Sequence, residues 1–175
     1  MRTEIRVAGT GGMGVVLAGV IVGRAAVVYG GLDAVQTQSY GSEARGTAAK
    51  SEVIVSDEPI KYPKVRKSDY LVAMSQKALD MYSGDSQDGS VIIVDDDLVD
   101  TSSLSSDYEI IRIPAMKIAD EMGRRMISNM VMLGALIKKS TVFTIDALEK
   151  AVADMVPPAT LELNLKAIRA GAELV

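Results

Sequence analysis

Four glycines near the start of the chain have the spacing of a loop that holds a phosphate group. They form the pattern Gly-x-Gly-x-x-Gly with one additional glycine inside it, at Gly9, Gly11, Gly12 and Gly14. An alternating stretch typical of a strand precedes them, and a long apolar run typical of a helix follows. In this position glycines allow a tight turn, and free backbone amides at the helix start attract a negative group. The motif is equally compatible with a turn that serves only close packing, and in either case we expect a β-branched residue at Gly11 or Gly12 to destabilise the fold.

A dinucleotide site has a further requirement, which is an acidic residue at the end of the second strand, about 20 residues further along. Asp33 stands near that distance, but it begins the second predicted strand, and the far end of that strand is the polar run at residues 36–40. The sequence therefore disfavours an NAD- or FAD-dependent oxidoreductase. A stand-alone nucleotide-binding oxidoreductase or regulatory module is kept as the alternative hypothesis.

A polar segment punctuated by glycines joins the second and third predicted strands, at residues 38–46. Packing gives no reason for so many hydrogen-bond donors and acceptors in one place. If the second strand runs parallel to the first, this segment emerges beside the glycine turn, at the edge where open α/β sheets bind ligands. A solvated connection in which Glu43 and Arg45 bond only neighbouring backbone groups is the other interpretation. Together with the four glycines, the candidate cofactor-binding residues are Ser39, Tyr40, Gly41, Glu43, Arg45 and Gly46.

The absence of cysteine and histidine excludes several kinds of chemistry. With Cys 0 and His 0 the chain can supply no cysteine to an iron–sulfur cluster, no Cys or His ligand to zinc, and no Ser–His or Cys–His pair. The acidic run at residues 95–97 follows a strand and could suggest magnesium, but charged turns after buried strands are far commoner. We therefore predict no metal ligand in this chain, and any general-base catalysis would fall to Asp, Glu, Lys or Tyr.

Charge and hydropathy exclude two classes of partner. A formal net charge of -4 offers no general attraction to phosphate backbones, so nucleic acid is not an expected ligand. The apolar run at residues 13–29 is interrupted by Arg24 and is too short for a membrane span, so it predicts a buried helix. The lack of cysteine and of a signal-peptide pattern predicts a cytoplasmic location.

The composition indicates one domain over residues 1–175, with some apolar surface intended for a partner. A chain of 175 residues is long enough to bury a sizeable core, and 48% hydrophobic residues is high for a free monomer. We expect the isolated chain to self-associate if that surface stays uncovered.

Strands and helices alternate along most of the predicted chain. Predicted strands cover residues 4–8, 33–40, 50–56, 69–74, 90–95 and 108–113. Predicted helices cover residues 13–29, 74–82, 116–123, 126–138, 144–155 and 160–173, and the polar tract at 83–90 is expected to be a surface loop. This order predicts an α/β fold, a single Rossmann-like three-layer domain with a mainly parallel sheet and a helical C-terminal part. The helix at 126–138 is apolar nearly all round, which places it in the core or between the core and a partner, and the core is favoured.

The sequence resembles the gamma subunits of 2-oxoacid:ferredoxin oxidoreductases, which correspond to one domain of the single-chain pyruvate:ferredoxin oxidoreductases. The similarity extends over nearly the whole chain, and family members usually have Pro at position 42 and Gly at position 47, where this chain has Ser42 and Thr47. The residues that carry the resemblance are Gly9-x-Gly11-Gly12-x-Gly14, residues 38–46, Lys50 to Ile54, Tyr62-Pro63-Lys64-Val65 and Asn129-Met130-Val131-x-Leu133-Gly134-Ala135.

The resemblance implies a role in converting a 2-oxoacid, coenzyme A and oxidised ferredoxin to acyl-CoA, carbon dioxide and reduced ferredoxin. The substrate it implies is 2-oxoglutarate or pyruvate, with the Tyr-Pro-Lys-Val stretch closer to the 2-oxoglutarate type. It also implies that thiamine diphosphate and iron–sulfur clusters belong to other subunits, and the lack of cysteine agrees. The chain would then be inert alone, with assembly surface and the polar segment at 38–46 as its contributions.

Overall fold

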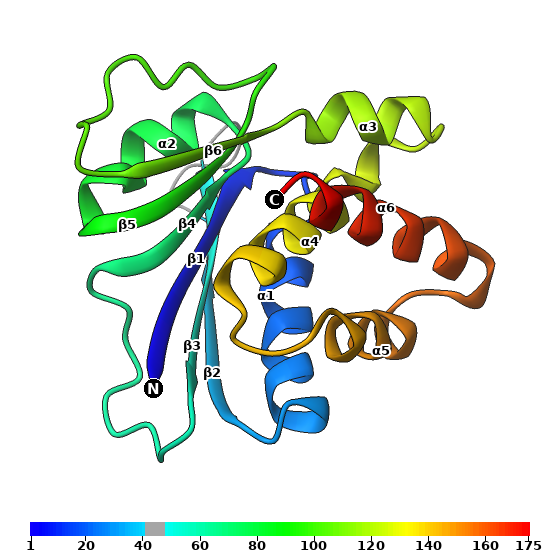
Figure 1. Ribbon diagram of the computed structural model, residues 1–175, viewed down its shortest axis with the longest axis horizontal. Coiled ribbons are helices and arrows are strands. Elements are labelled where there is room, and N and C mark those ends of the chain that lie inside the picture. Colours follow the sequence, from blue (N-terminus) through cyan, green and yellow to red (C-terminus); the bar gives the residue numbers. More distant parts are fainter. Residues whose placement is uncertain (41–47) are drawn as a thin grey trace.

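The computed structural model describes residues 1–40 and 48–175, and the centre of this part is a six-stranded sheet (Figure 1). Its strands lie in the order β2-β3-β1-β4-β5-β6. Pairing is parallel from β1 through β4 and β5 to β6, whereas β3 is antiparallel to both β1 and β2. The prediction of a mainly parallel sheet is confirmed. The strands are β1 (Arg2–Thr10), β2 (Asp33–Ser39), β3 (Ala48–Ser56), β4 (Ser68–Ala73), β5 (Ser86–Asp95) and β6 (Glu109–Ile113).

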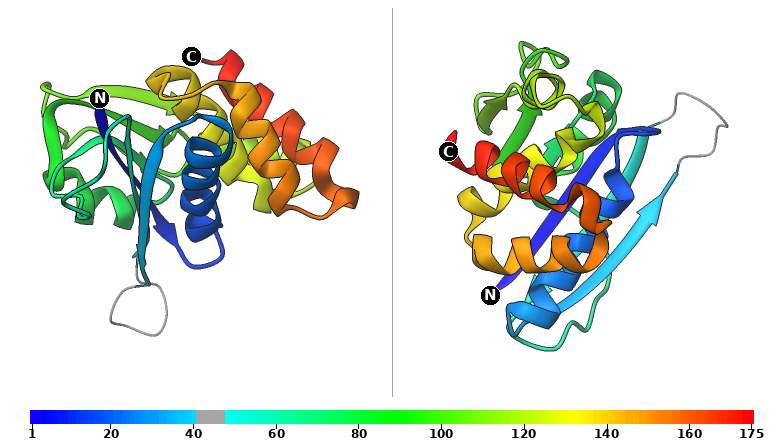
Figure 2. Two further views of the ribbon diagram at one scale, coloured as in Figure 1. Left: turned by 90° about the horizontal axis from the view of Figure 1, so that it is seen from below. Right: turned by 90° about the vertical axis from the view of Figure 1, so that its right-hand side faces the viewer.

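Helices cover both faces of the sheet, as the three-layer prediction requires (Figures 1 and 2). Helix α2 packs on one face, and α1, α4, α5 and α6 lie on the other. The helices are α1 (Val15–Arg24), continued by the π-helix η1 (Ala25–Tyr29), α2 (Gln76–Tyr82), α3 (Ala115–Glu121), α4 (Ser128–Ser140), α5 (Ile145–Met155) and α6 (Leu161–Glu173). Short 3-10 turns are η2 (Ser83–Asp85), η3 (Arg125–Ile127) and η4 (Pro158–Thr160).

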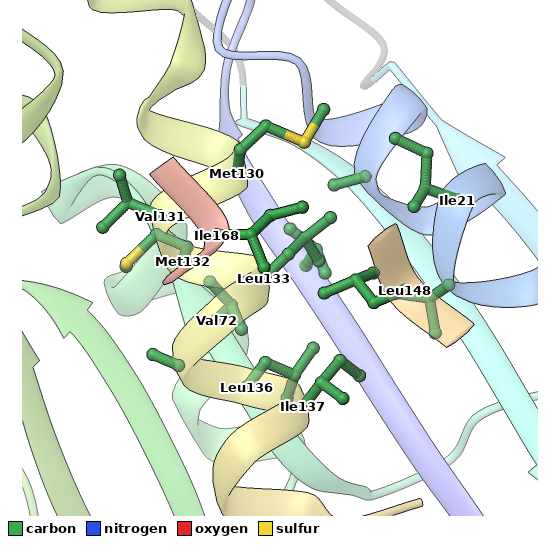
Figure 3. Close-up of a cluster of buried hydrophobic side chains, with 14 of the residues drawn as sticks. Ile21, Val72, Met130, Val131, Met132, Leu133, Leu136, Ile137, Leu148 and Ile168 are labelled. Carbon is green, nitrogen blue, oxygen red and sulfur yellow. The ribbon is translucent and has the colours of Figure 1, made fainter. Parts of the chain in front are cut away.

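Helix α4 lies at the centre of the larger hydrophobic core. All of its residues from Ser128 to Ile137 are buried, so the apolar helix belongs to the core, as the sequence favoured. Side chains from four other elements converge on it: Ile21 of α1, Val72 of β4, Leu148 of α5 and Ile168 of α6 (Figure 3). A helix that is apolar all round can be stable only when neighbours cover every side of it, and here they do.

Two glycines bring α4 and α6 into direct backbone contact. A Cβ atom at Gly134 of α4 would collide with the carbonyl group of Ile168, and a Cβ atom at Gly171 of α6 would collide with the carbonyl group of Val131. The two glycines therefore remove the atoms that would hold the helix axes further apart.

The polar tract at residues 83–90 was expected to be a surface loop, and this expectation is wrong. Residues 83–85 form η2, and the strand β5 already begins at Ser86. Ser86 pairs with Ser68 of β4, and their buried hydroxyl groups lie 3.4 Å apart. Pairing with a strand distant in sequence outweighs the local turn preference of serine and glycine here.

In the part of the chain that is described, no helix has the length and apolar character needed to cross a bilayer.

Replacing Gly134 or Gly171 by alanine is expected to lower the free energy of unfolding by about 1–3 kcal/mol or more, because the added methyl group meets backbone atoms that cannot rotate away. Gly84→Ala is the matched control, since a Cβ atom there has no neighbour within 4 Å. Chemical denaturation of the three variants measures the difference. Equal stability of all three would show that the two helices can separate without loss.

Candidate functional site

The glycine turn lies where the order of strands along the sheet reverses direction. From β1 the chain passes through α1 to β2 on one side, whereas β4, β5 and β6 follow one another on the other side. Helices α1 and α2 cover opposite faces, so the carboxyl end of β1 opens between them. Open α/β sheets bind ligands at such a switch point. This edge of the sheet is the candidate site.

The glycines of the turn meet different structural demands. Gly12 and Gly14 have φ values of 84° and 70°, in the left-handed region that strongly favours glycine. At Gly9, a Cβ atom would lie 3.0 Å from the sulfur of Met13 and 3.3 Å from the Cβ of Met74, so this position needs glycine for close packing. Gly11 has neither a positive φ nor any neighbour within 4 Å of a Cβ atom. The requirement expected at both Gly11 and Gly12 therefore holds only for Gly12.

A buried asparagine connects the glycine turn to the core, and reasoning from residue chemistry did not select it. The Nδ2 atom of Asn129, at the start of α4, donates a hydrogen bond of 3.1 Å to the carbonyl oxygen of Gly14, which also accepts the amide of Ala18 at 3.0 Å. Asn129 is 2% exposed, and a Cβ atom on Gly14 would collide with its side chain. Glycine is thus needed at position 14 for two reasons: its φ is positive, and a side chain there would collide with Asn129. The available signal was a polar side chain in the first turn of an otherwise apolar helix.

The described residues on either side of positions 41–47 lie at the same edge of the sheet as the glycine turn. In the antiparallel pairs, Ser39 at the end of β2 lies opposite Lys50, and Ala48 at the start of β3 lies opposite Thr10. Strand β2 runs in the same direction as β1, with β3 between them, so the condition set from the sequence is met. Tyr40 is 64% exposed here, and its hydroxyl group accepts a hydrogen bond of 3.4 Å from Gln38.

The candidate site residues therefore divide into two groups. The structure brings six of them to one edge of the sheet: Gly9, Gly11, Gly12, Gly14, Ser39 and Tyr40. The other four lie outside the described residues: Gly41, Glu43, Arg45 and Gly46.

The position of Asp33 argues against a dinucleotide site. Asp33 is the first residue of β2 and pairs with Ser56, at the opposite edge of the sheet from the glycine turn. In addition, the strand beside β1 on that side is the antiparallel β3, whereas dinucleotide-binding sheets place a parallel strand there. The acidic group that would hold a ribose is thus at the wrong end of the strand.

A buried cluster of charges lies on the α2 face of β1 and β3. Arg6 is 2% exposed, and its guanidinium group donates to Glu52 at 2.7 and 2.9 Å and to the carbonyl oxygen of Asp85 at 3.3 Å. Lys50 reaches the other oxygen of Glu52 at 3.0 Å, and both cations lie within 5.6 Å of the centre of the Tyr82 ring. A buried charge must be paired, so this cluster serves the fold. The alternating pattern of β1 does not reveal this pairing, because a strand's own sequence does not show which helix covers it.

Asp95, the first of three consecutive aspartates, has a structural role. Burial raises the pKa of its carboxyl group above the ordinary value, while hydrogen bonds from the backbone amides of Met116 at 2.8 Å and Asp97 at 3.1 Å act in the opposite direction. These bonds fix the end of β5 to the start of α3. Within residues 1–40 and 48–175, no group of three or more acidic side chains is arranged to hold a metal ion.

Comparison with known proteins identifies the family. The family model described as pyruvate ferredoxin/flavodoxin oxidoreductase matches residues 4–174. The chain belongs to this family. It is 50% identical to the 2-oxoglutarate synthase subunit KorC of Methanocaldococcus jannaschii, over 99% of this chain and 94% of that protein. It is 33% identical to the pyruvate synthase subunit PorC of Methanothermobacter marburgensis, over 95% and 93% of the two chains.

A solved structure in the family has the same fold. The gamma subunit of the keto/oxoacid ferredoxin oxidoreductase from Geobacter sulfurreducens superposes with a TM-score of 0.88 at 44% identity, covering 98% of this chain and 97% of that one. The predicted fold class and the resemblance to gamma subunits are both confirmed.

The two central glycines of the turn are expected to respond differently to substitution. Gly12→Ala should lower the free energy of unfolding by about 1–2 kcal/mol, because alanine is strained at a φ of 84°. Gly11→Ala should leave it within about 0.5 kcal/mol, since the position is open and the backbone is unstrained. Urea denaturation of both variants measures the contrast. A loss at Gly11 as large as that at Gly12 would contradict the assignment of the turn.

Proposed function

We propose that this chain is the gamma-type subunit of a multi-subunit 2-oxoacid:ferredoxin oxidoreductase whose substrate is 2-oxoglutarate. The observation that carries the proposal is the 50% identity to a 2-oxoglutarate synthase subunit along almost the whole length of both chains. Identity to the pyruvate synthase subunit is 33%, which favours 2-oxoglutarate over pyruvate. The whole of residues 1–175 would form one gamma-type domain, and a cytoplasmic location stays a prediction from the sequence.

In the proposed complex, other subunits supply the groups that carry out the redox chemistry. The complex would convert 2-oxoglutarate, coenzyme A and oxidised ferredoxin to succinyl-CoA, carbon dioxide and reduced ferredoxin. Thiamine diphosphate would supply the decarboxylation chemistry, and iron–sulfur clusters would carry the electrons. The chain has no cysteine with which to hold a cluster. We assign no catalytic residue to it, and ferredoxin would interact through the assembled complex.

The contribution of this chain to the active site would come from the carboxyl edge of its sheet. Gly11 and Gly12 are exposed there, and the positive end of the α1 dipole favours a negatively charged group. Coenzyme A and the thiamine adduct both carry phosphates. We assign Arg45 as the residue of the polar segment best suited to pair with such a phosphate, because guanidinium groups bind phosphate through two parallel hydrogen bonds.

Co-purification tests the proposal directly. Expressed together with the thiamine-diphosphate and ferredoxin-type subunits, the tagged chain should recover a complex that reduces ferredoxin with 2-oxoglutarate and coenzyme A. The isolated chain should not reduce ferredoxin under the same conditions. The ratio kcat/KM should favour 2-oxoglutarate over pyruvate by at least about 10-fold, which corresponds to about 1.4 kcal/mol of transition-state discrimination.

Two results would contradict this proposal. One is recovery of the chain without any partner subunit. The other is micromolar NAD(H) binding by the isolated chain in calorimetry, which would favour the stand-alone nucleotide-binding module. Sedimentation of the isolated chain tests, separately, the predicted self-association.

Replacing Arg45 by alanine is expected to leave the complex assembled and to lower kcat/KM for coenzyme A by about 10- to 150-fold, the equivalent of about 1.5–3 kcal/mol for a lost charge-assisted hydrogen bond. Arg169→Ala is the control, because Arg169 pairs with Glu149 on the surface between α5 and α6. Steady-state kinetics at limiting coenzyme A decide the matter. If the kinetics are normal, the polar segment serves only as a contact between subunits. If the complex fails to assemble, Arg45 has a structural role.

A further inference from the structure

The connection between β3 and β4, residues 57–67, carries the densest group of positive charges in the described chain. It contains Lys61, Lys64, Arg66 and Lys67, whereas the protein as a whole has a net charge of -4. The connection leaves β3 at Ser56, which lies opposite Arg2 at the start of β1, so it stands at the opposite edge of the sheet from the glycine turn. In Figure 1 it runs beside the N-terminus, below β4.

No carboxylate of residues 1–40 or 48–175 forms an ion pair with these cations. Lys61, Lys64 and Lys67 make no ion pair with any residue in the described ranges, and all three are exposed. By contrast, Asp57 at the start of the connection is already paired, at 2.7 Å, with the α-amino group of Met1. The segment thus carries four positive charges against the two carboxylates of Asp57 and Glu58, which gives a net positive surface on an acidic protein.

The backbone under these charges is held in place. The guanidinium group of Arg2 donates to the carbonyl oxygen of Tyr62 at 2.8 Å, and Arg66 lies over the Tyr62 ring at 4.5 Å with a hydrogen bond of 3.3 Å to its hydroxyl group. Pro59 and Pro63 each restrict one φ angle of the connection. A segment ordered before binding loses less conformational entropy when it docks, and tyrosine and arginine are residue types enriched at interfaces.

The shape of this surface favours a protein over a small anion. The segment borders an open hollow of about 630 Å³ that Arg2, Lys61 and Lys64 line, but Glu4 and Glu58 also line it. A compact polyphosphate inside the hollow would meet these carboxylates. A broad acidic surface would instead cover the open hollow from outside. It would contact the exposed side chains of Lys61, Lys64 and Tyr62 at the lining, and Lys67 beside it.

We propose that residues 57–67 form a docking surface for an acidic face of another subunit of the same enzyme complex. This inference rests on the proposed function, which supplies the partner subunits. A subunit fits better than a diffusing electron carrier, because this chain has no cysteine or histidine to hold a redox group that such a carrier would need to approach. Charge complementarity of this kind acts mainly on the rate of association and on its dependence on salt.

Charge reversal at the three lysines tests the proposal. The triple variant K61E/K64E/K67E should associate with the remaining subunits at least about 10-fold more slowly than the parent chain at about 0.05 M salt, and the difference should shrink toward about 0.5 M salt. The matched control is K117E/K138E/K166E, which changes the net charge equally at exposed lysines of α3, α4 and α6. It should associate within about 2-fold of the parent. Association is followed by biolayer interferometry, and circular dichroism confirms that each variant folds.

The outcomes separate this inference from the proposed function. Equal slowing by both triple variants would assign the effect to net charge and overturn the docking surface. Normal association combined with a loss of ferredoxin-dependent turnover would overturn the assignment to a subunit in favour of the electron carrier. If the parent chain binds no subunit at all, the proposed function itself fails.

As a second variant, Tyr62→Ser should accelerate dissociation of the chain from its partner subunit. An unchanged dissociation rate would show that the Tyr62 ring does not contribute to the interface.

Discussion

Direct contact between the backbones of α4 and α6 is the constraint on which the rest of this structure depends. Gly134 and Gly171 let the two helices approach to a distance that no side chain would allow. Helix α6 therefore covers the outer side of α4, and the inner side of α4 packs on the sheet and on α1. The amino end of the same buried helix carries Asn129, which holds the carbonyl group of Gly14. The position of the glycine turn is thus set by packing far from it in sequence.

The sequence predicted those parts of the molecule that depend on local patterns. The strand–turn–helix unit around Gly9 to Gly14 and the core location of α4 follow from glycine spacing and from an apolar surface on all sides of one helix. Pairing partners are not local. The antiparallel insertion of β3 beside β1, the extension of β5 back to Ser86 and the buried pair of Arg6 with Glu52 each depend on residues far apart in the chain. Polar residues are assigned to the surface by pattern alone, and only tertiary contacts reverse that assignment.

The candidate site shows the same division. Its glycines were identified from spacing, but spacing does not show that Gly12 and Gly14 have a positive φ while Gly11 does not. That difference arises from the path the chain must take between the end of β1 and the start of α1. The contact with Asn129 lies 115 residues away, beyond the reach of any local motif. A motif thus indicates that a turn is special, and the fold decides which of its residues make it so.

Strand β3 connects the two surfaces to which we assign partners. It begins beside the glycine turn, where Ala48 lies opposite Thr10, and it ends at the basic connection, after Ser56. The eight steps between the first and last of these nine extended residues place those ends about 27 Å apart. Hydrogen bonds to β1 and β2 on both sides, and the close packing of Gly19 of α1 on Ser51, keep this spacer rigid. A subunit without redox groups of its own would then contribute through geometry. The rigid strand would fix a partner docked at one edge relative to the edge to which we assign the active-site contribution.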